Sequence, residues 1–248
     1  MKVIILAAGK GIRLNLDVPK VLAPLCGMTM IEHVVENVLA SGVDPCPIVV
    51  IGHESGRVAE VLKDYSVQTV YQAEQLGTGH AVMTCELAVN KDEDVLVIGG
   101  DHPLISPEII KALSDKHQNE KKTMTFVTYE VSDFDVHGGV FNSFGRIVRD
   151  SKGNVYKIRE VRDANEEELR IKEVNPAYYA FSTNWLFKQL AKLETNNAQE
   201  EYYLTDIVKM GMESGLPVSV LRGENLHEAI GINTEEDLVK VESILLNK

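Results

Sequence analysis

Short apolar segments bounded by turn residues recur along the first half of the chain. They lie at Val3–Leu6, Ile48–Ile51, Val67–Tyr71, Val95–Ile98 and Met124–Val127, and helix-like stretches often follow them. Such segments fit strands buried on both faces, and strands that alternate with helices form parallel sheets. The pattern therefore predicts an α/β fold, with a Rossmann-like, mostly parallel sheet that carries helices on both faces.

The segment from about residue 134 to 179 has a different pattern. Glycines separate two alternating stretches, Gly145–Val148 and Val155–Ile158, which is typical of hairpins and predicts a smaller antiparallel insertion. Helical spacing returns at Trp185–Leu193 and Leu204–Gly215. A last helix is expected at Thr234–Leu246, with Thr234 as the N-cap and an acidic residue at the capping-box position.

Charge and cysteine content narrow the function classes. The formal net charge is -12, which argues against nucleic acid and an anionic membrane surface as partners, because both attract clustered positive charge. The three cysteines are widely spaced and predict neither a disulfide framework nor a thiolate zinc site, so a cytoplasmic location is expected. No apolar stretch has the length of a membrane span, and the N-terminal apolar run is interpreted as a strand and not as an export signal.

A glycine-rich turn follows the first predicted strand. Its small residues would let backbone N–H groups approach phosphate oxygens, while Arg13 and Lys20 supply positive charge. The spacing is not that of a Walker P-loop, and Leu14 occupies the third glycine position of the dinucleotide fingerprint. From these residues alone, a phosphate site and an ordinary strand-to-helix turn with two solvated cations both remain open.

Several motifs in a fixed order resemble those of the sugar-phosphate nucleotidyltransferase family. The motifs are Leu6–Arg13 with Pro19–Leu22, Gln72–Ala81, Gly100–Ile105, Gly145–Ile147 and Asn197–Asp206. Together they are similar to the uridyltransferase domains of bifunctional bacterial enzymes that form UDP-N-acetylglucosamine, and the resemblance covers essentially the whole chain. Those enzymes continue into an acetyltransferase built of hexapeptide repeats, which this sequence does not contain, so acetyltransferase activity is expected to be absent.

The resemblance assigns roles to individual residues. It implies Arg13 and Lys20 as catalytic residues and Mg²⁺ as the cofactor, held by Asp101 and Asn233. It implies further residues for the nucleotide (Leu6, Ala7, Ala8, Gly9, Gln72, Gly77, Thr78) and for the sugar (Gly100, Gly145, Glu160, Asn175). The whole chain, 1–248, would then be one domain, with a nucleotide-binding lobe at about 1–133, a sugar-binding lobe at about 134–233 and a closing helix at 234–248.

Each assignment has a simpler alternative in the residues themselves. Asp101 follows a predicted strand, where open sheets bind ligands, and this favours a metal ligand, while the simpler alternative is a turn aspartate before a proline. Asn233 could be an ordinary helix-start residue, and Thr78 an ordinary helix cap. Glu160 lies between arginines and resembles a solvated surface residue, whereas His102 is expected to be a bystander. The acidic run at residues 166–168 is interpreted as an exposed helix face.

The expected reaction is transfer of a uridylyl group from UTP to N-acetylglucosamine 1-phosphate, releasing pyrophosphate. The chain departs from the family pattern at Ile12 in place of Thr, Gly99 in place of Tyr, and Ala177 in place of Gly. These departures keep open the same chemistry with another sugar 1-phosphate or nucleoside triphosphate. A non-catalytic nucleotide-sugar sensor is the alternative from another class. Homo-oligomerisation and a separate acetyltransferase partner are also left open.

Overall fold

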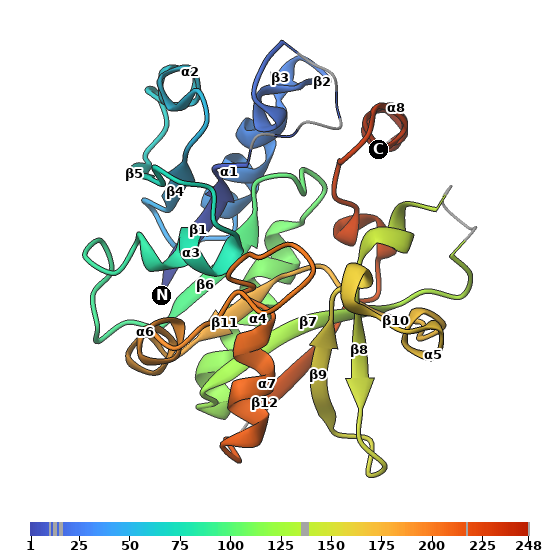
Figure 1. The fold of residues 1–248 in the computed structure, drawn as a ribbon. Helices are drawn as coiled ribbons and strands as arrows, with labels where there is room; N and C mark the ends of the chain where they lie inside the picture. The colour runs from blue at the N-terminus through green and yellow to red at the C-terminus, as the bar shows by residue number, and fades with distance from the viewer. Residues whose placement is uncertain (10, 12–13, 15–16, 135–138, 217, 248) are drawn as a thin grey trace.

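A large mixed sheet runs through the computed structural model, which describes residues 1–9, 11, 14, 17–134, 139–216 and 218–247 (Figure 1). The strands are β1 (Lys2–Ala7), β2 (Pro24–Leu25), β3 (Met28–Thr29), β4 (Ile48–Ile51), β5 (Gln68–Tyr71), β6 (Val95–Gly99), β7 (Met124–Glu130), β8 (Gly145–Arg149), β9 (Val155–Arg159), β10 (Glu173–Asn175), β11 (Tyr179–Phe181) and β12 (Val218–Arg222). The α-helices are α1 (Met30–Ala40), α2 (Ser55–Val61), α3 (Thr78–Met83), α4 (Pro107–Glu120), α5 (Glu166–Leu169), α6 (Thr183–Leu190), α7 (Asp206–Glu213) and α8 (Glu235–Leu246). Short 3-10 helices are η2 (Lys20–Leu22), η3 (Val140–Ser143), η4 (Val161–Asp163) and η5 (Leu226–Ala229).

The N-terminal half forms the parallel core of this sheet, in the order β5-β4-β1-β6. Alternate residues of β1 enter two separate hydrophobic clusters, because successive side chains of a strand point to opposite faces. Ile5 packs in the cluster that includes Val34 of α1, whereas Ile4 packs in the cluster that includes Leu186 of α6. The predicted parallel sheet with helices on both faces is therefore confirmed for this half.

The strand order changes after β6, in a way that the sequence pattern did not predict. The short strand β11 lies antiparallel between β6 and β7, with Tyr179 opposite Val97 on one side and Phe126 on the other. Strand β12 pairs with β7 in parallel. The sheet thus has a parallel core but is mixed overall. Strands β6 and β7 are consecutive in the chain, yet β11 separates them in the sheet.

The antiparallel part of the sheet continues through β10, β8 and β9. The predicted hairpin is confirmed, since β8 and β9 pair antiparallel with Ile147 opposite Ile158. Figure 1 shows these strands on the opposite side of the molecule from β4 and β5. The α/β fold class is therefore confirmed, with the antiparallel part joined edge to edge with the parallel core.

The helix ends show which local signals were reliable. Helix α8 begins after Thr234, which accepts a hydrogen bond from the backbone N–H of Asp237, and the predicted capping box is confirmed. Helices α6 and α7 replace the somewhat longer stretches expected there. The prediction for residues 166–168 is wrong for Glu168, whose side chain is 12% exposed and pairs with Lys157 and Arg159 of β9.

Across the described part of the chain, no helix is both long enough and apolar enough to cross a membrane.

Candidate active site

The turn after β1 lies against the end of β6. In the sheet, Leu6 is opposite Gly99, and the backbone N–H of Gly100 donates to the carbonyl oxygen of Leu6 over 2.9 Å. A Cβ added to Gly100 would lie 3.2 Å from the Cβ of Ala7. The turns that follow β1 and β6 therefore approach so closely that a side chain at residue 100 would be crowded. The carboxyl ends of neighbouring parallel strands thereby bring the glycine-rich turn beside Asp101.

Of the predicted site residues in this turn, the structure describes some, while others lie outside the described ranges. Leu6, Ala7, Ala8 and Gly9 are described, and Ala7 and Ala8 are buried at the end of β1. Among the described residues, no atom outside the adjoining backbone lies within 4 Å of the place that an added Cβ at Gly9 would take. Arg13, predicted to be catalytic, lies outside the described residues, and so does the departure at Ile12.

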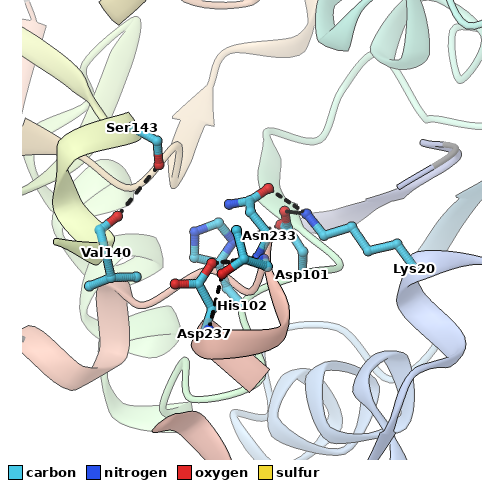
Figure 2. A network of polar contacts seen from close by, with 8 residues as sticks. Lys20, Asp101, His102, Val140, Ser143, Asn233 and Asp237 are labelled. Atoms are coloured by element: carbon cyan, nitrogen blue, oxygen red, sulfur yellow. Dashed lines mark hydrogen bonds and ion pairs between the residues drawn. The ribbon is translucent and has the colours of Figure 1, made fainter. Parts of the chain in front are cut away.

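Three residues from distant parts of the sequence meet at this edge of the sheet. The Nζ of Lys20 lies 2.6 Å from Oδ2 of Asp101 and donates a second hydrogen bond, over 2.8 Å, to Oδ1 of Asn233 (Figure 2). The side chain of Lys20 is 12% exposed and that of Asp101 is 27% exposed, so both remain partly open to solvent. The structure therefore brings the predicted catalytic lysine together with both predicted metal ligands.

Lys20 is positioned by its own local structure. It begins the short helix η2, where Val21 and Leu22 are buried and Pro19 occupies the N-cap position with ψ of 139°. The Cβ of Lys20 also packs against Gly11, whose φ of 62° lies in the left-handed region that favours glycine. These contacts direct the ammonium group toward the end of β6.

Asn233 is positioned by the start of α8. The carboxylate of Asp237 accepts hydrogen bonds from the backbone N–H groups of Asn233 and Thr234, each over 2.9 Å. One residue earlier, the N–H of Ile232 donates to the carbonyl oxygen of Asp101. A helix-start motif and one backbone bond thus fix the Asn233 side chain beside Asp101, which goes beyond the simple helix-start alternative.

The segment before Asn233 is held by a second set of contacts, centred on Glu228 of η5. Its carboxylate accepts hydrogen bonds from Ser106 and Tyr129, and its carbonyl oxygen accepts one from the hydroxyl of Tyr178 over 2.6 Å. Burial, together with the charge of Glu228, raises the pKa of Tyr129 far above its usual value, so this hydroxyl remains a donor. The segment that carries Asn233 is therefore attached to both α4 and β7.

The electrostatics of the site favour a bound cation. Burial alone would raise the pKa of Asp101, but the ammonium of Lys20 and the ring of His102 together hold it well below its usual range. Asp101 is thus ionised at any pH near neutrality. Two oxygen atoms, one charged and one from an amide, converge on a single positive group.

This donor set fits Mg²⁺. Magnesium prefers oxygen ligands and commonly takes only one or two from protein, with phosphates and water as the others. The ammonium of Lys20 already stands between Oδ2 of Asp101 and Oδ1 of Asn233, where a cation would contact both atoms. Within the described ranges, no group of three or more His, Cys, Asp or Glu side chains is gathered closely enough to hold a metal, as many zinc sites require.

His102 is not the bystander that the sequence suggested. Its side chain is 10% exposed, and Nδ1 lies 2.9 Å from Oδ1 of Asp101, the carboxylate oxygen that does not face Lys20. The ring packs edge-on against Tyr178 and Phe144, with ring centroids 5.2 Å and 6.2 Å away. The prediction failed because contact between adjacent side chains depends on ring orientation, which the flanking structure determines.

The predicted base-reading residues lie together where the loop after β5 enters α3. Gln72 is 2% exposed, and its amide Nε2 donates to the carbonyl oxygen of Gly77 and lies 2.9 Å from Nδ1 of His80. Thr78 is the first residue of α3 and not its N-cap, a position taken by Gly77 with φ of 109°. The Gln72 side chain therefore stabilises the loop that would contact a base.

A segment that received no site assignment joins the two halves of the site. The N–H of Gly79 donates to the carbonyl oxygen of Tyr202, and the N–H of Leu204 donates to the hydroxyl of Thr78. The next residue, Thr205, donates its hydroxyl hydrogen bond to Oε1 of Glu160 over 3.0 Å. The motif Asn197–Asp206 was recognisable as a block, but only the fold shows that it connects the base loop with a predicted sugar residue.

Two of the predicted sugar residues are neighbours in the sheet. Gly145 of β8 is opposite Asn175 of β10, and the Asn175 amide donates to the hydroxyl of Tyr179 over 2.6 Å. The amide oxygen accepts a hydrogen bond from the N–H of Ala177, whose φ of 63° is in the left-handed region. The family's glycine at this position thus corresponds to a turn that an alanine adopts only with strain.

Glu160 differs from the solvated residue that its neighbouring arginines suggested. It is half-buried, and Arg159 pairs with Glu168 instead. Burial, with further contributions from Asp206 and Asp163, raises the pKa of Glu160 above its ordinary value. No ion pair joins Glu160 to a cationic side chain in the part of the chain that the structure describes. A carboxylate kept partly desolvated in this way is costly, and such groups often occur at binding sites.

These features define a class of α/β protein in which a glycine-rich turn, a lysine and two oxygen donors gather at the carboxyl edge of a parallel sheet. Residues 3–206 match the family described as the MobA-like NTP transferase domain. The chain therefore belongs to the MobA-like NTP transferase domain family.

Individual relatives agree with this assignment. The chain is 43% identical to the bifunctional protein GlmU of Streptococcus agalactiae over 248 residues, and 40% identical to that of Clostridioides difficile over 244 residues. The alignments cover 99% and 98% of this chain but 52% and 51% of the relatives, so the chain spans about half the length of these proteins. A solved structure of UDP-glucose pyrophosphorylase complexed with UDP-glucose matches with a TM-score of 0.79 at 18% identity, covering 99% of this chain and 98% of that one.

Proposed function

We propose that this nucleotidyltransferase carries out the magnesium-dependent transfer of a uridylyl group from UTP to N-acetylglucosamine 1-phosphate, giving UDP-N-acetylglucosamine and pyrophosphate. The observation that carries the proposal is the convergence of Lys20, Asp101 and Asn233 beside the glycine-rich turn. The relatives named GlmU, at 43% and 40% identity, support this choice of substrates.

The reaction needs positioning and charge neutralisation more than a protein nucleophile. A phosphate oxygen of the sugar 1-phosphate attacks the α-phosphorus of UTP in line, and the bond to the bridging oxygen of the β-phosphate breaks as pyrophosphate leaves. A phosphate monoester is already nucleophilic near neutral pH, so no general base is required. Lys20 stabilises the charge at the α-phosphorus, while the turn at Ala7–Gly9, with Arg13, binds the β- and γ-phosphates.

Asp101 and Asn233 are the residues that would hold Mg²⁺, because their oxygen atoms already share one cation. When bound, the metal supplies charge neutralisation and a template for the phosphates. With a metal held by these two oxygens, Lys20 would be available to bind phosphate. The side chains of Lys20 and Asp101 are 12% and 27% exposed. This partial exposure supports a role in which the Lys20 ammonium leaves Asp101 and Asn233 while the site stays folded.

Specificity is divided between two loops in this proposal. Gln72, Gly77 and Thr78 read the uracil edge, and the contacts to Gly77 and His80 hold the Gln72 amide in place for that task. Gly100, Gly145, Glu160 and Asn175 bind the sugar hydroxyl and N-acetyl groups. Glu160 is suited to accept hydrogen bonds from hydroxyl groups because it is partly desolvated.

The test is pyrophosphate release by purified protein with Mg²⁺, using UTP, CTP, GTP, ATP and dTTP against N-acetylglucosamine 1-phosphate and glucose 1-phosphate. Release only with UTP and the N-acetylated sugar is the expected result. Asp101→Asn should remove most turnover, whereas Asp115→Asn, which changes an exposed aspartate of α4, should not. Pyrophosphate release with a different substrate pair would support the proposed reaction type but contradict the proposed substrates. Nucleotide binding without pyrophosphate release from any pair would favour a non-catalytic sensor.

A further inference from the structure

His102 contacts both segments that carry the proposed metal ligands. On one side, Nδ1 lies 2.9 Å from Oδ1 of Asp101, and a carboxylate can only accept a hydrogen bond, so Nδ1 is the donor. On the other side, the Nε2 edge of the ring faces Gly231, where an added Cβ would lie 2.9 Å from Nε2. Gly231 is two residues before Asn233. The ring therefore fills the space between one ligand and the backbone that presents the other.

The ring also accounts for the glycine at position 99. A Cβ added there would lie 2.5 Å from Oδ1 of Asp101 and 2.8 Å from Nδ1 of His102, closer than real Cβ contacts. A side chain at residue 99 and the bond between His102 and Asp101 therefore exclude each other. The loss of an aromatic residue at Gly99 is thus linked to the histidine three positions later.

Tight packing fixes the orientation of the ring. Tyr178 and Phe144 contact it edge-on, and only 8% of the residue is exposed. With Oδ1 of Asp101 bound by His102, the second oxygen, Oδ2, is the one that faces Lys20 at 2.6 Å. A ring held in this way sets which carboxylate oxygen points into the site.

We infer that His102 is a positioning residue for the metal site: it orients the Asp101 carboxylate through Nδ1 and supports the Asn233 segment by packing against Gly231. The inference rests on the proposed function, since it takes Asp101 and Asn233 as the metal ligands. Groups that orient metal ligands in this way typically contribute about 10- to 100-fold to metal affinity or activity.

Two amide substitutions separate the hydrogen bond from the bulk of the side chain. In His102→Asn the amide nitrogen takes approximately the place of Nδ1, whereas in His102→Gln it takes approximately the place of Nε2. Binding of Mn²⁺, measured by electron paramagnetic resonance without nucleotide, should weaken about 10- to 100-fold in the Gln variant and far less in the Asn variant. The Mg²⁺ concentration for half-maximal pyrophosphate release should rise in the same order, with a smaller change in the KM for UTP.

A double substitution tests the contact with Gly231. Gly231→Ala should weaken Mn²⁺ binding when His102 is present, because the added Cβ meets the ring, and should cost less in the His102→Asn background, where those ring atoms are gone. Thermal unfolding is measured for every variant, and a variant whose melting temperature falls without a change in Mn²⁺ affinity indicates structural support only.

The results distinguish the inference from the function on which it rests. A wild-type protein that releases no pyrophosphate with any substrate pair would remove the proposed function. A wild-type protein that is active, with Asn and Gln variants that bind Mn²⁺ equally well or equally badly, would overturn the role of Nδ1 in His102. Selective weakening in the Gln variant supports it.

Discussion

Replacing Lys20 with methionine tests whether Asp101 and Asn233 form a cation site. Methionine keeps most of the length of the side chain but removes the ammonium, so it leaves two oxygen atoms facing each other across an empty position. Breaking a fully buried ion pair costs about 3–5 kcal/mol. Because Asp101 is 27% exposed and is also bound by His102, we expect a smaller loss, about 2 kcal/mol. For a chain of this size that is a fall in Tm of about 4–8 °C.

Metal should reverse this loss in the variant more than it stabilises the wild type. A ligand at 100 times its Kd stabilises the state that binds it by about 2.7 kcal/mol. In Lys20→Met the ammonium no longer competes for the two oxygens, whereas in the wild type the metal has to displace it. The increase in Tm on adding Mn²⁺, measured by scanning calorimetry without nucleotide, should therefore be larger in Lys20→Met than in the wild type.

Lys111→Met is the matched control. Lys111 also pairs with an aspartate, Asp115 at 2.8 Å, but the two side chains are 59% and 48% exposed. Exposed pairs of this kind contribute about 0–1 kcal/mol, so little change in Tm and no change in the response to Mn²⁺ are expected. Equal Mn²⁺ responses in wild type and Lys20→Met would refute the reasoning, because the two oxygens would then not be the metal site.

Two further substitutions test the sugar side of the site. Glu160→Gln should raise Tm at pH 7.5, because the pKa of Glu160 is raised on folding and its ionisation destabilises the fold. The gain should shrink as the pH falls and vanish well below 4.5, the ordinary pKa of this carboxyl, where the carboxyl is protonated in both the folded and the unfolded state. The same variant should raise the KM for the sugar 1-phosphate about 10-fold or more, through loss of a charged acceptor, and an unchanged KM would remove Glu160 from the sugar site. Ala177→Gly should stabilise the protein by about 0.5–1 kcal/mol. The φ of 63° strains alanine by about 1–2 kcal/mol, and relief of this strain is only partly offset by the greater conformational entropy of glycine in the unfolded chain. A calorimetric Tm at or below that of the wild type would show that the turn relaxes around alanine.

Local sequence patterns predicted the elements that depend on local physics. The apolar runs of β1, β4 and β6 are strands because both sheet faces are covered, and Thr234 caps α8 because its hydroxyl reaches a backbone N–H of its own first turn. The position of Asp101 also followed from a general rule, since ligands gather at the carboxyl ends of parallel strands. These inferences needed no knowledge of distant contacts.

The parts that the sequence did not predict depend on contacts between distant segments. Strand β11 has only three residues, Tyr179–Phe181, and its place between β6 and β7 follows from pairing with residues more than 50 positions away. For Glu160, the neighbouring arginines suggested solvation, but Arg159 turns to Glu168 and leaves the carboxylate to Thr205. Such pairing between distant side chains determines which groups face a site, and the hydrophobic periodicity of the sequence does not show it.

The strand order also limits when the active site can form during synthesis. Strands β1 and β6 lead into the glycine-rich turn and Asp101, and both are complete once residue 101 has been made. Strand β6 nevertheless lacks its second neighbour until β11 emerges near residue 181, and Asn233 follows later still. Pairing over such separations slows folding and leaves strand edges exposed in the meantime. A ribosome-bound fragment that ends before β11 would therefore present an unpaired β6 edge. We expect binding by chaperones to matter most while the residues between β6 and β11 are being synthesised, because that edge is exposed during this time.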